Sequence, residues 1–359
     1  MTDPQAGVEQ VLTAPASEPA LPASEPPVPT AIRELPLGAG RLIPVSFDLL
    51  WRAEAPIRHA SFYIGFLLLA TVGPAVALFA AAALTFGGAV FDPFTGSDEW
   101  SVWLSITLLV AGAGFFVASV EARLIATAVI AATLEGRDLT MGGLLALARR
   151  RFWTAARAAF LIGIPILVGQ NAGEALARAI AGPSAEVAFI GNIVGGVLFG
   201  TPFVYALSGV VLGEVSAGES VRRSWRLFGA RPRLAVVVTT FSLASQFVLL
   251  FAISAGADIT IRVLEALGIG DGIPVLAGVL ASAVLVFALG TLVFLAEALA
   301  ATPAVHAFVA LTHYTRGLAA GRQPADEARG RRAWITRPLV VGTMLGVAAM
   351  VAGLASLGV

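Results

Sequence analysis

Seven long apolar stretches limit what this chain can fold into more than any other feature. A bilayer core is about 30 Å thick, so a helix that crosses it needs about 20 mainly apolar residues. The chain is 57% hydrophobic and only 13% charged, whereas soluble domains carry about 25% charged residues. We therefore expect an all-α polytopic membrane helix bundle. The stretches are Ala60–Phe86, Val102–Val120, Ala155–Asn171, Val187–Gly213, Leu234–Ala257, Ile273–Ala296 and Pro338–Leu357.

The second and sixth stretches continue past the point where a spanning helix should end. Glu121 and Arg123 interrupt the second stretch, and apolar sequence then continues to Leu134. Glu297 interrupts the sixth, and apolar sequence continues to about Tyr314. We expect each stretch to form one long helix that leaves the membrane and continues beside interfacial segments.

The placement of arginine predicts the orientation in the membrane. Arginine is concentrated in the connections Glu135–Arg157, Glu214–Arg233 and Arg316–Arg337, whereas the alternate connections hold one arginine or none. Cytoplasmic connections collect positive charge, so we expect a cytoplasmic N-terminus and, after the seventh helix, a C-terminus outside. All 23 basic residues are arginine, which is typical of a GC-rich genome and favours the cytoplasmic membrane of a bacterium.

Composition also excludes several classes of site and partner. The absence of cysteine excludes disulfides and thiolate metal sites. The net charge of zero gives no overall attraction to nucleic acid. The HExxH, Walker, GxSxG and dinucleotide-binding motifs are all missing. We therefore expect no catalytic residue, metal or cofactor, and a protein that is not an enzyme.

Three related segments indicate an internal repeat of one interfacial helix, one helix out and one helix back. They are Leu37–Trp51, Leu139–Arg157 and Val215–Phe228, and each precedes an apolar run. A Thr-Pro pair at 201–202 recurs at 302–303 in the returning helices. The aligned positions are Gly40, Gly142 and Gly218; Leu50, Phe152 and Phe228; and Trp51 and Trp153.

The repeat divides the chain into four parts. Residues 1–36 are rich in Pro, Ala and Glu and predict a disordered cytoplasmic tail. Residues 37–318 form the repeat domain with six core transmembrane helices, and residues 319–337 form a basic cytoplasmic linker. Residues 338–359 form a seventh transmembrane helix.

The third interfacial segment shows the amphipathic pattern most clearly. Ser216 and Glu219 form a capping box that should begin the helix, and Pro232 should end it. Val221, Trp225 and Phe228 share one face and the arginines occupy the other, as in helices that lie among lipid headgroups. The arginines either set topology alone or form a site for lipid headgroups or a protein partner. The candidates for that site are Arg149, Arg150, Arg151, Trp153, Arg222, Arg223, Trp225 and Arg226.

Small residues mark the fourth apolar stretch as a helix that packs closely. Glycine pairs four residues apart let helix backbones approach each other in membranes. We expect this helix at the centre of the bundle. The glycines are Gly191, Gly195, Gly196, Gly200, Gly209 and Gly213.

Ionisable residues within or near the apolar stretches form a second group of candidates. They either pair with arginine near the inner interface or form a proton or cation site between the first and third repeats. Histidine at these positions can also simply pack between helices. The residues are Glu121, Arg123, Glu297, His306 and His313.

The segments LTMGGLLALARRRFW, VSAGESVRRSWRLF and ATPAVHAFVALTHYTRG resemble the polytopic membrane domain associated with some bacterial glycerophosphoryl diester phosphodiesterases. The resemblance covers residues 37–318. The family's ending has two aromatics, Asp and Arg, but Thr315 stands here in place of Asp. The resemblance implies a membrane domain only, because the phosphodiesterase activity belongs to a separate soluble domain that nothing in this chain matches.

These observations lead to one expected function and one alternative. We expect an accessory, scaffold or lipid-organising protein at the inner face of the membrane, without enzymatic activity. Its expected partners are membrane lipids, especially anionic ones, or a protein in the membrane. The alternative is a transporter or exporter of a lipid-like amphiphile, because the expected midplane is almost wholly apolar.

Overall fold

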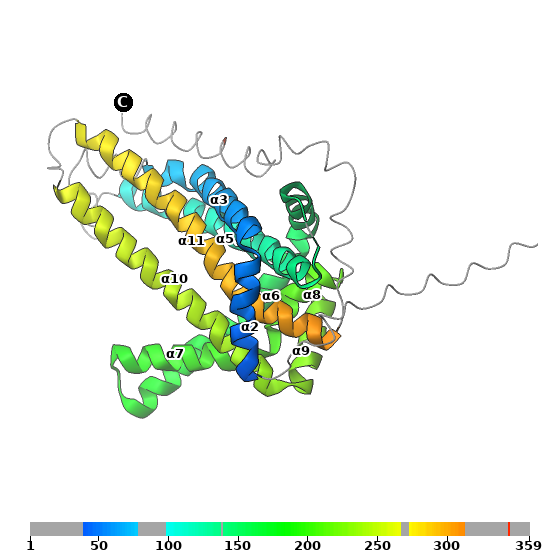
Figure 1. The fold of residues 1–359 in the computed structure, drawn as a ribbon. Coiled ribbons are helices and arrows are strands. Elements are labelled where there is room, and N and C mark those ends of the chain that lie inside the picture. Colours follow the sequence, from blue (N-terminus) through cyan, green and yellow to red (C-terminus); the bar gives the residue numbers. More distant parts are fainter. Residues whose placement is uncertain (1–38, 78–97, 138, 267–272, 313–343, 345–359) are drawn as a thin grey trace, which may run out of the picture.

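The computed structural model describes residues 39–77, 98–137, 139–266, 273–312 and Met344 (Figure 1). Every element of this part is a helix, which confirms the all-α prediction. The expected tail, linker and seventh helix lie outside the described residues, apart from Met344. The elements are α2 (Ala39–Arg52), α3 (Glu54–Thr71), α5 (Asp98–Leu134), α6 (Met141–Ala181), α7 (Ala185–Gly200), the 3-10 helix η2 (Thr201–Phe203), α8 (Ala206–Leu212), α9 (Ala217–Ala230), α10 (Pro232–Ala266) and α11 (Ile273–Thr312).

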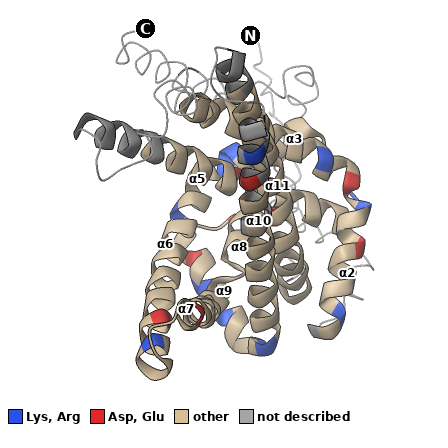
Figure 2. Ribbon diagram, turned by 90° about the vertical axis from the view of Figure 1, so that its left-hand side faces the viewer, with Lys and Arg blue, Asp and Glu red and all other residues tan. Residues whose placement is uncertain are grey.

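Within the described residues, five helical segments are long and apolar enough to cross a membrane. They lie in α5, in α6, in α7 together with α8, in α10 and in α11. The end of the first expected span lies outside the described residues. Figure 2 shows the charged residues in short segments separated by long uncharged lengths of helix. The membrane character of the chain is thus confirmed by length and composition.

Helices α5 and α11 are continuous through their charged residues, as predicted. Helix α5 passes through Glu121 and Arg123 without a break, and α11 passes through Glu297 and Pro303. At a rise of 1.5 Å per residue, helices of 37 and 40 residues are about 56 and 60 Å long. Each is therefore much longer than a bilayer core is thick.

The second interfacial segment is not a separate helix. It forms the first turns of α6, which continues for 41 residues and includes Pro165. By contrast, α2 and α3 are separated at Ala53, and α9 and α10 at Arg231. Pro56 and Pro232 lie just after these breaks, and proline cannot donate the backbone hydrogen bond that would continue a helix. No proline or glycine lies at the corresponding point of α6, so the helix does not break there.

The fourth apolar stretch was expected to be one helix at the centre of the bundle, and both expectations are wrong for its first half. The helix breaks at Thr201–Phe203, where a 3-10 turn containing Pro202 separates α7 from α8. Helix α7 packs against α6 and touches α10 near the edge of the bundle (Figure 1). Only the short α8 is central, because it packs against α5, α6, α9 and α11.

The core of the described bundle is formed by the second half of α11. Every residue from 298 to 309 is buried except Leu299, which is partly buried. Helix α11 packs along α3, α5 and α10 and also contacts α2 and α8 (Figure 1). This core lies on the side where α2, the start of α6 and α9 gather.

Glycine allows α6 and α7 to form the closest helix pair in the described part. A Cβ atom at Gly195 would overlap the backbone carbonyl of Gly169, and one at Gly191 would overlap the carbonyl of Gly173. The predicted close packing thus occurs, but the partner is the hairpin neighbour α6. Gly209 instead lies against Ser220 of α9 and Phe308 of α11.

Candidate functional site

Two polar contacts connect the long helices in the interior. The Tyr63 hydroxyl of α3 donates a hydrogen bond of 2.9 Å to Glu121 Oε1 of α5. Arg123 of α5 forms an ion pair of 3.2 Å with Glu297 of α11, and their side chains are only 13% and 19% exposed. The charge of Arg149, at the start of α6, also acts on the Glu121 carboxylate. The ionisable residues predicted from sequence therefore pair with one another across α3, α5 and α11.

His306 of α11 is fully buried, and neither ring nitrogen has a hydrogen-bond partner in the described part of the chain. Tyr205, which precedes α8, is also fully buried, and its hydroxyl has no partner there. His313 lies outside the described residues. Among the described residues, no cluster of His, Asp or Glu could hold a metal ion.

Helix α9 is attached to the broken fourth span by two serines. Ser224 Oγ donates to the Pro202 carbonyl at 2.7 Å and accepts from the Tyr205 backbone N–H at 3.1 Å. Ser220 Oγ donates to the Ala206 carbonyl. Backbone groups near the Pro202 break are thus paired with α9. The face of α9 that turns inward is therefore the serine face, which sequence analysis did not identify.

The predicted ends of α9 are confirmed. Ser216 caps the helix by accepting the Glu219 backbone N–H, and the helix ends at Ala230, just before Pro232. Trp225 contacts Phe203 and Phe228, as expected for a shared face. That face is nevertheless half open, because Trp225 is 55% exposed.

Exposed tryptophans lie at all three interfacial segments. Trp51, Trp153 and Trp225 are 82%, 73% and 55% exposed. Neighbouring arginines differ in their surroundings. Arg151 pairs with Glu214 at 2.8 Å, and Arg223 and Arg226 both approach Glu219. The exposed arginines beside these tryptophans are Arg52, Arg149, Arg150, Arg222 and Arg226.

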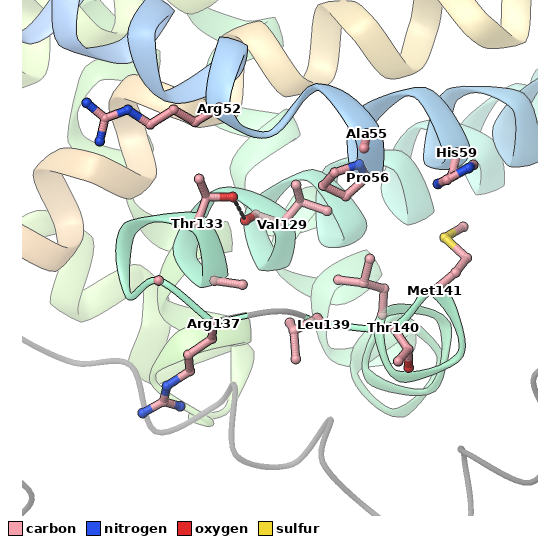
Figure 3. Close-up of a pocket in the computed structure, with 13 residues that line it drawn as sticks. Arg52, Ala55, Pro56, His59, Val129, Thr133, Arg137, Leu139, Thr140 and Met141 are labelled. Carbon is pink, nitrogen blue, oxygen red and sulfur yellow. Dashed lines mark hydrogen bonds between the residues drawn. The ribbon is translucent and has the colours of Figure 1, made fainter.

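A pocket of about 480 Å³ lies between the α2–α3 junction and the α5–α6 turn (Figure 3). Arg52, Pro56 and His59 line it from α2 and α3. Arg137 lines it from the turn after α5, and Met141 lines it from the start of α6. In Figure 3 His59 and Met141 lie at one end of the pocket, and Arg52 and Arg137 lie at the other.

The α5–α6 turn has a defined hydrogen-bond pattern. Gly136 adopts a φ of +63°, a left-handed conformation that favours glycine. Its N–H bonds the Thr133 carbonyl at 3.2 Å, and the Arg137 N–H bonds the Ala132 carbonyl at 2.9 Å. These two bonds form a Schellman motif, which satisfies carbonyls at the end of α5. Thr140 then caps α6 by accepting the Gly143 N–H at 3.2 Å.

The pocket carries positive charge at its two ends. Arg52 and His59 are exposed, and neither has a hydrogen-bond or ion-pair partner among the described residues. The Arg137 Nε pairs with Glu135 at 2.6 Å, so its terminal nitrogens are directed elsewhere. Sequence analysis assigned no site here. A glycine and then a threonine between two helices was the local signal that could have located the turn.

Comparison of the chain with protein-family models, curated proteins and solved structures found no match. The resemblance to the phosphodiesterase-associated membrane domain therefore stays a prediction.

Proposed function

We propose that this chain is a non-enzymatic integral membrane protein that binds and organises lipid at the inner face of a bacterial cytoplasmic membrane. The observation that carries the proposal is the exposure of Trp51, Trp153 and Trp225 beside arginines at three separate segments. Tryptophan is enriched at membrane–water interfaces, and each arginine near anionic lipid contributes about 1 kcal/mol. Exposed apolar and cationic groups in this combination favour a headgroup layer as their surroundings.

Burial supports the threefold repeat that this proposal uses. When Gly40, Gly142 and Gly218 are aligned, the positions two and six residues later are buried in all three copies. The first set is Leu42, Leu144 and Ser220, and the second is Ser46, Ala148 and Ser224. Three segments that bury equivalent positions would present their tryptophans and arginines to the same headgroup layer.

A cytoplasmic orientation follows from the same segments. The starts of α6 and α9 lie in the arginine-rich connections, which the positive-inside rule places in the cytoplasm. The N-terminus would then be cytoplasmic as well. The C-terminus would lie outside if residues 338–359 form the seventh span.

Transport of a lipid-like amphiphile is the second candidate, and the break at Thr201–Phe203 favours it. Broken membrane helices are common in transporters, where they line the substrate site. Here, however, Ser224 pairs the backbone groups at the break, and Arg123 pairs with Glu297. The lipid-organising role therefore agrees better with the geometry.

The test is the lipid composition of native membrane discs that contain the protein. We expect anionic lipid to be enriched over the bulk membrane, and the enrichment to fall in a variant with Arg149→Gln, Arg150→Gln and Arg222→Gln. A variant with Arg178→Gln and Arg262→Gln removes exposed arginines elsewhere in the chain and should keep the enrichment. Wild-type discs with bulk composition would contradict the proposal. Flux of a labelled amphiphile that is lost in Glu121→Gln or Glu297→Gln would favour transport instead.

A further inference from the structure

We propose that the pocket between the α2–α3 junction and the α5–α6 turn binds the phosphate group of an anionic phospholipid headgroup. This inference rests on the proposed function and names one place where a headgroup is held individually, apart from the exposed tryptophans. The pocket is described by thirteen lining residues from four helices and one turn. Its volume of about 480 Å³ lies within the usual range for small-ligand sites, about 300–1,000 Å³.

The charges of the lining residues favour a phosphate. Arg52, Arg137 and His59 contribute its ionisable groups, and no carboxylate is among the described lining residues. Glu135 pairs with Arg137 through Nε only, which leaves the terminal nitrogens of that guanidinium for a ligand. Arginine suits phosphate because its planar nitrogens can donate two parallel hydrogen bonds to phosphate oxygens.

The backbone around the pocket is also arranged for an anion. The first turn of α6 begins at Met141, on the pocket wall, and the first N–H groups of a helix attract negative charge. The opposing partial charge at the end of α5 is reduced, because Gly136 and Arg137 donate to its final carbonyls. The turn therefore places a positive helix end in the pocket and satisfies carbonyls of the neighbouring negative one.

The position and the walls of the pocket favour a lipid over a soluble phosphate ester. Arg52 directly follows Trp51, which is 82% exposed. His59 directly precedes Ala60, where the first apolar stretch begins. Pro56, Val129 and Leu139 provide apolar lining that can contact the glycerol and upper acyl carbons. The cationic ends and apolar walls thus match the two parts of a phospholipid near its phosphate.

The test uses the purified full chain in discs of phosphatidylethanolamine with a minor fraction of phosphatidylglycerol. Native mass spectrometry then measures the phosphatidylglycerol that each protein retains. Removing one arginine from the phosphate should weaken retention about fivefold, and removing two should weaken it about thirtyfold. We therefore expect Arg52→Gln with Arg137→Gln to lose most retained lipid, whereas Arg178→Gln with Arg262→Gln should keep it.

A second variant keeps every charge and fills the pocket instead. Ala55 lines the pocket and is exposed, so Ala55→Trp can occupy the space without crowding the core. We expect it to lower retention as strongly as the double arginine variant. Elution volume and melting temperature equal to those of the wild-type protein show that both variants remain folded.

The outcomes separate this inference from the proposed function. No preference of the wild-type protein for phosphatidylglycerol overturns both. A wild-type preference that survives Ala55→Trp and the double arginine variant overturns the pocket alone, and assigns lipid binding to the tryptophan-bearing segments. Displacement of retained lipid by millimolar inorganic phosphate, with loss of phosphate binding in the double arginine variant, supports the phosphate site but assigns it to a soluble ester.

Discussion

Replacing Arg123 by Met should destabilise the helix bundle by about 2–3 kcal/mol. Removing one partner of a buried ion pair usually costs about 3–5 kcal/mol, because it leaves an uncompensated charge in the interior. The Arg123 and Glu297 side chains are 13% and 19% exposed, so some solvent screening remains and we expect a smaller value. The substitution also removes the 3.3 Å hydrogen bond from Arg123 to the Glu297 backbone carbonyl.

The double variant makes this prediction specific. Glu297→Leu alone should destabilise the protein by a similar amount, whereas Arg123→Met with Glu297→Leu removes both charges together. Apolar side chains of similar volume often replace a buried ion pair without loss of stability. We therefore expect the double variant to lie within about 1 kcal/mol of the wild-type protein, which gives a coupling energy of about 3–4 kcal/mol.

The assay is reversible unfolding in mixed micelles with increasing sodium dodecyl sulfate, followed by circular dichroism. Arg262→Met is the control, because its ion pair with Asp258 is 73% and 60% exposed. It should change the free energy of unfolding by at most about 1 kcal/mol. If the double variant loses the sum of the two single effects, the pair does not interact as the geometry indicates, and the reasoning is refuted.

Three further substitutions can be measured by the same unfolding assay. Gly195→Val should destabilise the α6–α7 hairpin by about 1–3 kcal/mol, because its side chain would overlap an α6 carbonyl, whereas Gly163→Val points into open space and should cost much less. Ser224→Ala should cost about 1–3 kcal/mol by removing both bonds to the break between α7 and α8, and the exposed Ser254 serves as its control. Gly136→Ala should cost about 1–2 kcal/mol, because its φ of +63° is left-handed. Wild-type stability in any of these three variants would contradict the corresponding contact.

Where the helices lie along the sequence could be predicted, because local rules decide it. Ser216 and Pro232 bound α9 through a cap and a missing N–H, and both act within a few residues of the helix end. The continuation of α5 beyond Glu121 followed from apolar composition alone. Hydrophobicity over 20 residues needs no knowledge of the partner helix, so the membrane-spanning character of the chain was also accessible.

Tertiary structure decided what the helices do to one another. The same Thr-Pro pair breaks the chain at 201–202 and leaves α11 continuous at 302–303. Ser224, about twenty residues away, pairs the backbone near the first of these prolines, and no local pattern contains that information. The pocket likewise joins Arg52 and His59 to Arg137, more than seventy residues later. Sequence thus set which segments are helical and apolar, whereas contacts between distant segments set which polar groups meet, because such contacts depend on packing in three dimensions.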